Sequence, residues 1–204
     1  MATIAIGCAN WEKAELGHAA QLQVFDSRRL EAVFNDCVAG PENTRLVGGA
    51  DEPLYRPAVA GQGECLLVYR DDYFASALHE ISHWCIAGLK RRQQLDFGYW
   101  YAPEGRSASQ QRAFERVEVK PQALEWFFSK ACRYRFRISV DNFNDETGEL
   151  HDTSQFRHDL LAQVHYWQQA GLPPRAAQFY QALGAEFGTG LRVSQLEFNA
   201  QELC

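Results

Sequence analysis

Apolar residues recur at helical spacing along much of the chain, and the most regular stretch runs from Asp72 to Ala87. Its apolar positions keep the i, i+3, i+4, i+7 spacing of a core-facing helix side: Phe74, Ala77, Leu78, Ile81, Trp84 and Cys85. Asp71 and Asp72 offer an N-cap, and Gly88 offers a C-cap. Further helices are predicted at residues 24–39, 110–117, 121–133, 154–170 and 173–187; the first is capped by Asp26 or Ser27 and stopped by Gly40-Pro41.

Short β-prone runs precede the helix at 72–87. Residues 64–70 follow the turn signal Gly61-Gln62-Gly63 and pair as a hairpin with residues 54–60, which Pro53 and Pro57 confine to a sheet edge. Residues 44–48 predict a third short strand, residues 134–144 a strand or a loop, and residues 94–109 a loop. The pattern indicates an α+β fold: one helix-dominated domain over residues 1–204, with a small mixed sheet.

Composition narrows the class of protein. The chain has 204 residues, of which 46% are hydrophobic, enough for one buried core, and a net charge of −6 argues against a nucleic-acid binder. No apolar run approaches the ~18 residues that a membrane span needs, and the start lacks the basic region of a secretory signal. The six cysteines form no C-x-x-C pair, so neither a disulfide framework nor a thiolate zinc site is indicated. We expect a cytoplasmic monomer.

The stretch His79-Glu80-Ile81-Ser82-His83 carries most of the chemical information. Residues four apart lie on one helix face, so both imidazoles can reach one divalent metal, and Glu80 can address a metal-bound water. The alternative is a hydrogen-bonded pair of structural histidines. The upstream strand and the regular helical pattern favour a zincin-like metal helix.

A third protein ligand is expected, and in zincin-like proteins it often comes from a glutamate on a later helix. Glu118 lies 35 positions after His83, among apolar neighbours where a carboxylate needs a partner. Glu115 shares its helix face but is more easily explained as a solvated acid beside Arg116. The remaining histidines, at positions 18, 151, 158 and 165, have no ligand spacing with the pair.

Two reactions suit this set of ligands. With zinc, the metal polarises a peptide carbonyl and activates water while Glu80 takes the proton. With ferrous iron, two histidines and one carboxylate leave positions for dioxygen and support hydroxylation. The H-x-D tripeptide of jelly-roll iron oxygenases is absent from the sequence. The residues alone therefore favour a zinc metallopeptidase, and an adaptor with a structural metal is a third, non-enzymatic hypothesis.

Longer segments resemble the bacterial elongation factor P hydroxylases. The resemblance covers residues 77–88, residues 96–106 with the run Asp96-Phe97-Gly98-Tyr99-Trp100-Tyr101, residues 115–125, and residues 136–142. It implies an Fe(II)-dependent enzyme that uses dioxygen to hydroxylate the modified, β-lysylated lysine of elongation factor P, on a fold unlike the jelly-roll oxygenases. Zinc is a possible substitute for the iron, and no direct contact with nucleic acid or a membrane is implied.

The resemblance also implies roles for individual residues. His79, His83 and Glu118 bind the metal, while Glu80 orients bound water or the substrate amine. Tyr99, Trp100 and Tyr101 either pack on the lysine stem and its ammonium, where a cation–π contact contributes roughly 0.5–2 kcal/mol, or close the core over the site.

Arginine positions leave two matters open. The spacing of Arg106, Arg116 and Arg133 does not require a 2-oxoglutarate co-substrate. The alternating Arg133, Arg135 and Arg137 form either a basic face that orients a partner or a solvated edge.

Overall fold

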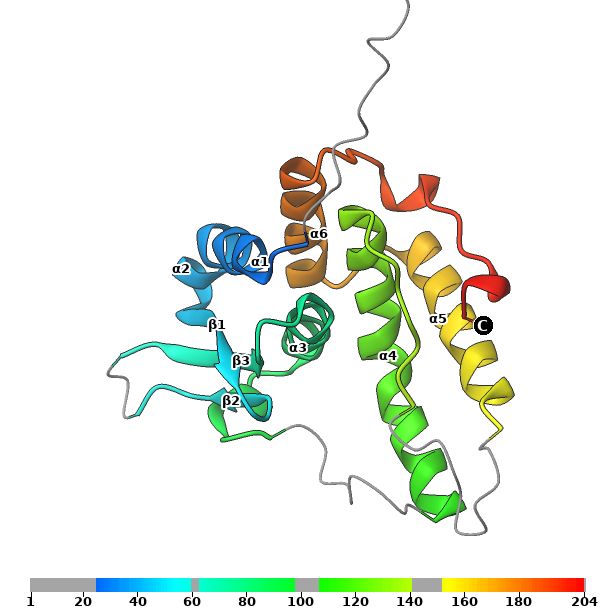
Figure 1. Cartoon of the computed structure of the whole chain (residues 1–204), viewed down its shortest axis with the longest axis horizontal. Coiled ribbons are helices and arrows are strands. Elements are labelled where there is room, and N and C mark those ends of the chain that lie inside the picture. Colours follow the sequence, from blue (N-terminus) through cyan, green and yellow to red (C-terminus); the bar gives the residue numbers. More distant parts are fainter. Residues whose placement is uncertain (1–24, 60–62, 98–106, 141–151, 204) are drawn as a thin grey trace, which may run out of the picture.

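The computed structural model describes residues 25–59, 63–97, 107–140 and 152–203, and helices dominate it (Figure 1). The helices are α1 (Ser27–Phe34), α2 (Gly40–Glu42), α3 (Phe74–Ile86), α4 (Ala108–Cys132), α5 (Ser154–Ala170) and α6 (Pro174–Glu186). A π-helical turn (Asn35–Ala39) joins α1 to α2, and three short 3-10 turns span Arg91–Gln93, Val193–Gln195 and Ala200–Leu203. Within these ranges no helix is long and apolar enough to cross a membrane.

Three strands form the sheet: β1 (Thr44–Ala50), β2 (Leu54–Arg56) and β3 (Cys65–Arg70), in the order β1-β3-β2. The central strand β3 is parallel to β1 and antiparallel to β2, so the small mixed sheet and the hairpin are both confirmed. Strand β2 ends before Pro57, because a proline has no N–H to donate to the ladder.

Helix α3 lies between the sheet and α4, while α5 and α6 pack against the other sides of α4 (Figure 1). The apolar stripe predicted for α3 is buried as expected, with Leu78 and Ile81 fully covered. Helix α4 contributes the bulkiest part of the same core through Trp126, Phe127 and Phe128. The interface between α3 and α4 is therefore covered by apolar side chains on several sides, and this is where the two predicted histidines point.

Several predicted boundaries were wrong. Gly40-Pro41 does not end the first helical stretch, which continues without a break through the π-helical turn and α2 to Glu42, one residue past Pro41. Neither Asp71 nor Asp72 caps α3: Tyr73 occupies the cap position, and Asp71 instead turns the chain with a positive φ of 48°. The C-cap of α3 is Ala87 rather than Gly88.

The two helices predicted around Pro121 are one continuous helix, α4. Proline at this position removes a single intrahelical hydrogen bond, while large buried side chains on both sides hold the helix in place. Ser107 and Gln110 close its start with a reciprocal capping box. The proline therefore sits inside the helix instead of starting a new one.

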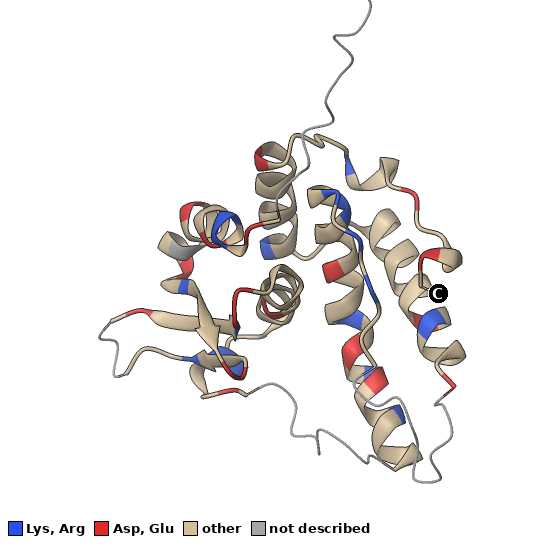
Figure 2. Ribbon diagram, viewed as in Figure 1, with Lys and Arg blue, Asp and Glu red and all other residues tan. Residues whose placement is uncertain are grey.

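Residues 134–140 belong to no helix or strand, so the described part of this segment is a loop, and residues 141–144 lie outside the described ranges. The segment runs back along α4: the Ser139 N–H donates to the Gln122 amide oxygen (3.0 Å), and the Gln122 amide donates to the Ser139 carbonyl (2.7 Å). Arg135 and Arg137 are exposed. Figure 2 shows basic positions along the segment that runs beside α4. A role for this arginine row in binding a partner stays a prediction.

Arg175, near the start of α6, closes the C-terminal end of α3. Its guanidinium donates to the carbonyl oxygens of Trp84 (3.1 Å), Cys85 (3.0 Å) and Ala87, three of the unsatisfied acceptors at that helix end. The guanidinium carbon also lies 4.9 Å from the centroid of the Trp84 ring. One side chain thus fastens the helix that carries both histidines to α6.

We expect Arg175→Lys to lower the free energy of unfolding by about 1–2 kcal/mol, because lysine keeps the charge but is shorter than arginine and lacks the planar guanidinium that lies over Trp84 and places Nη2 among the three carbonyls. Urea unfolding followed by circular dichroism measures the change. The matched control is Arg28→Lys, since Arg28 is largely exposed and solvent screens its pair with Asp26. Equal stability losses in the two variants would contradict this assignment.

Candidate metal centre

His79 and His83 lie one turn apart on α3 and turn their rings toward α4. The ring centroids are 4.7 Å apart, and the two Nε2 atoms approach to 3.0 Å. Glu118 reaches them from α4: its carboxylate oxygens lie 3.5 Å from Nε2 of His79 and 3.3 Å from Nε2 of His83. The residues predicted as ligands from the sequence are therefore brought together by two different helices.

The distances fit a cation. Ligand bonds of about 2.0–2.2 Å at angles between 90° and 109° place donor atoms roughly 3.0 to 3.5 Å apart, which matches the three separations. Among the histidine, cysteine, aspartate and glutamate side chains of the described residues, His79, His83 and Glu118 form the group whose geometry suits a metal ion. Glu115 is not part of it; that carboxylate is buried one turn earlier, beside the Gln111 amide.

Glu118 is buried to an extent that demands compensation. Its side chain is 4% exposed, and among the described residues its Oε2 atom has no hydrogen-bond donor. Burial alone would raise the pKa of Glu118, but His83, His79 and the Gln122 amide together hold that pKa at about 2. An ionised carboxylate with one oxygen left without a donor, facing two imidazole nitrogens, is the arrangement that a divalent cation would complete.

Glu125 contacts His79 from the other side of the ring. Its Oε2 lies 2.9 Å from Nδ1 of His79, and the carboxylate is buried in the interface between α3 and α4. Burial opposes a charged imidazole, but this hydrogen bond and the carboxylates of Glu118 and Glu125 outweigh it and raise the pKa of His79 to about 10.

Sequence reasoning missed Glu125, although a signal for it exists. The buried polar residues of α4 recur at alternating steps of four and three: Gln111, Glu115, Glu118, Gln122 and Glu125. Such a spacing normally marks an apolar stripe, so a polar stripe at the same period indicates a helix face turned toward an interior polar site.

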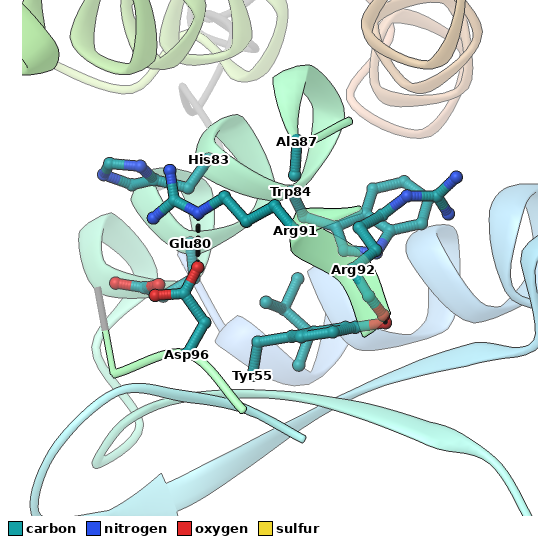
Figure 3. A pocket seen from close by; sticks show the side chains of 9 residues that line it. Tyr55, Glu80, His83, Trp84, Ala87, Arg91, Arg92 and Asp96 are labelled. Atoms are coloured by element: carbon teal, nitrogen blue, oxygen red, sulfur yellow. Dashed lines mark hydrogen bonds and ion pairs between the residues drawn. The ribbon is translucent and has the colours of Figure 1, made fainter. Parts of the chain in front are cut away.

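Glu80 projects from α3 into a pocket beside the two histidines. The pocket is lined by apolar and aromatic side chains, among them Tyr55, Leu67 and Trp84, and by His83 and Glu80 at one end (Figure 3). Arg91 and Asp96 form an ion pair on the same side of this pocket. Burial raises the pKa of Glu80 above its usual value, although the two neighbouring histidines oppose that shift. The pocket therefore leads from the surface to His83 past an acidic group.

Other predicted residues lie apart from the centre or outside the described ranges. Tyr99, Trp100, Tyr101, Arg106, His18 and His151 belong to residues that the structure does not describe. His158 is paired with Asp159 and His165 with Gln168, both on α5, as expected for histidines that do not bind the metal. Arg116 and Arg133 are exposed.

We expect Glu118→Gln to weaken divalent-metal binding by more than about 100-fold, beyond the ~10–100-fold typical of residues that only support a ligand. Equilibrium competition against a chromogenic chelator under anaerobic conditions measures the dissociation constant. Glu115→Gln is the matched control on the same helix, and its dissociation constant should stay within about twofold of the unmodified protein. If the two variants exchanged these results, Glu115 would be the third ligand.

Two comparisons with known proteins agree on a family. The model of a family described as elongation factor P hydroxylase matches residues 33–198, which include both histidines and Glu118. The chain is also 44% identical over 168 residues to a protein of Haemophilus influenzae named elongation factor P lysine hydroxylase, across 82% of this chain and 93% of that protein. The resemblance first recognised in the residues is thus confirmed. The chain belongs to the elongation factor P hydroxylase family.

Proposed function

We propose that this protein hydroxylates a lysine side chain of elongation factor P, in its β-lysylated form, at a ferrous centre held by His79, His83 and Glu118. The observation that carries the proposal is the convergence of two imidazole nitrogens and one buried carboxylate in a chain of this family. The name of the Haemophilus influenzae relative supports the substrate. The whole chain would then act as one hydroxylase domain, with elongation factor P as its partner.

Iron suits the ligand set better than the alternatives for this reaction. Ferrous iron held by these two histidines and one carboxylate would supply dioxygen activation: one oxygen atom would enter the C–H bond and the other would leave as water, with two electrons from an external reductant. Zinc binds the same donors more tightly but has no redox chemistry, so it would substitute without supporting the reaction. Nothing in the described residues requires 2-oxoglutarate.

The residues of the chain supply orientation and the exclusion of water. Helices α3 and α4 fix the three ligands within a largely apolar interface, where the buried carboxylate cannot relax toward solvent. The side chains of His79 and His83 are 25% and 14% exposed, so the centre is partly open to small molecules. The lysine stem would lie along Tyr55 and Trp84 of the adjoining pocket.

Glu80 is the residue proposed to handle the charge of the substrate. An aliphatic ammonium entering the pocket would meet this carboxylate next to His83, and a charge-assisted hydrogen bond would hold the amine while the carbon chain faces the centre. The proposal also includes packing of Tyr99, Trp100 and Tyr101 on the same lysine, and these three residues lie outside the described ranges.

The arrangement also keeps a second candidate, a zinc metallopeptidase with Glu80 as general base. The placement of Glu80 beside His83, with the third ligand on a later helix, is what favours it, and the same placement supports the description of α3 as zincin-like. The family match favours hydroxylation over peptide cleavage. A modifier of a translation factor would act in the cytoplasm, in agreement with the expectation from the sequence, and the monomeric state stays a prediction.

We expect the iron-loaded protein, supplied with a two-electron reductant, to add one oxygen atom to β-lysylated elongation factor P under air, as intact-mass spectrometry with peptide mapping would show. Unmodified factor and an anaerobic reaction serve as negative controls. The variant His83→Ala should give no addition because it loses a ligand, while Glu115→Gln should retain the activity. An unchanged mass of the factor, with iron occupancy and reduction state verified, would contradict the proposal.

Glu80→Gln separates the two candidate functions. For a hydroxylase we expect KM for the protein substrate to rise roughly 10- to 100-fold, since about 1.5–3 kcal/mol of charged hydrogen bonding is lost, with a smaller change in kcat. For a peptidase the zinc-loaded variant should lose at least about 100-fold in kcat for a cleavable peptide. Peptide cleavage by the unmodified zinc protein that disappears in this variant would overturn the hydroxylase assignment.

A further inference from the structure

Glu125 is a buried carboxylate that lies outside the group of proposed ligands and yet contacts one of them. It is 6% exposed, and its Oε2 lies 2.9 Å from Nδ1 of His79. The two nitrogens of an imidazole point in divergent directions from the ring. Nε2 of His79 faces His83 and Glu118, so Glu125 approaches the ring from behind and cannot share the same cation.

We propose that Glu125 is a positioning residue, which accepts the Nδ1–H of His79 and thereby keeps the lone pair of Nε2 directed at the cation. A neutral imidazole carries its proton on one nitrogen only, and the partner of that nitrogen decides which tautomer is populated. A carboxylate behind the ring also makes the opposite nitrogen a stronger donor to a metal. The proposal rests on the metal site of the proposed function.

Helix periodicity explains why the role falls to this residue. Glu118 and Glu125 are seven positions apart, close to two turns, so both project from the same face of α4 toward α3. The Glu118 carboxylate lies beside both Nε2 atoms. Glu125 lies two turns farther along α4, on the Nδ1 side of the His79 ring. Gln122, between them on the stripe, holds the segment at Ser139 against α4, which keeps solvent from this side of the stripe.

Burying a second carboxylate next to the first is unfavourable unless a specific contact compensates it. Burial raises the cost of the charged form of Glu125, and Glu118 is a like charge in the same interface. For a purely structural contact between α3 and α4, an apolar residue at position 125 would serve better, as Leu124 and Trp126 on either side illustrate. A hydrogen bond to a metal-binding imidazole gives the carboxylate a function at this position.

The test compares Glu125→Ala and Glu125→Gln with Glu115→Gln, a buried glutamate of the same stripe. Dissociation constants for Co(II) and Zn(II) are measured by chelator competition, and the visible absorption of the Co(II) protein reports the geometry around the metal. We expect about 10–100-fold weaker binding for Glu125→Ala with an altered cobalt spectrum. Glu125→Gln should lose less, because its amide oxygen still accepts the Nδ1–H, and Glu115→Gln should bind as the unmodified protein does.

A structural role alone would lower the melting temperature and leave the dissociation constant and the cobalt spectrum of the folded protein unchanged, and that result would overturn the proposal. Should Glu125→Ala not fold, Glu125→Asp replaces it, because the shorter side chain withdraws the carboxylate from Nδ1 and should weaken binding similarly. Loss of metal binding in these variants is measured without substrate. The test of Glu125 therefore gives its result independently of whether the loaded protein hydroxylates elongation factor P.

Discussion

The structure depends on one buried charge, the carboxylate of Glu118 at the interface of α3 and α4. Removing an ion from water costs several kcal/mol, and only close partners offset that cost. The partners here are the two imidazoles of α3, placed on its inner face by their four-residue spacing, with the Gln122 amide beside them. The packing of α3 against α4 and the chemistry of the site are therefore set by the same contacts.

The surrounding elements hold those contacts in place. The sheet supports one side of α3, α5 and α6 support α4, and Arg175 ties the end of α3 to α6. Interiors of this packing density do not deform easily, so the spacing of the three donor atoms is preorganised before any cation arrives. The pocket lined by Tyr55, Trp84 and Glu80 also reaches His83. A rigid ligand frame beside a pocket that ends at an acid suits a cationic, flexible substrate such as a lysine side chain.

Local periodicity made much of this predictable from the sequence. The apolar stripe of α3, the pairing of His79 with His83, and the two helices after residue 152 follow from spacing alone. Glu118 was expected because a carboxylate among apolar neighbours needs a partner. The hairpin followed from the glycine turn, and the position of β1 in the sheet did not, since pairing between distant strands leaves no local trace.

The predictions that were wrong or incomplete failed because of contacts in the tertiary structure. A proline is a strong local signal for a helix start, and only the burial of α4 on several sides explains why the helix continues through Pro121. Aspartate is a common N-cap residue, but the backbone of Asp71 is hydrogen-bonded to the backbone of Gly49 and Ala50 instead. Glu125 carries no motif of its own. It becomes visible only when the polar positions of α4 are read at the same period as apolar ones, as a stripe that faces another helix.

The central claim is that one cation is held by His79, His83 and Glu118. Diffraction at the iron absorption edge, on crystals of protein purified and loaded without oxygen, tests it most directly. The account predicts one anomalous peak about 2.0–2.2 Å from Nε2 of each histidine and from a Glu118 oxygen, with the remaining positions open. A peak elsewhere would contradict it. So would a crystal soaked to saturation with iron in which the two imidazoles remain hydrogen-bonded to each other and no peak lies near them.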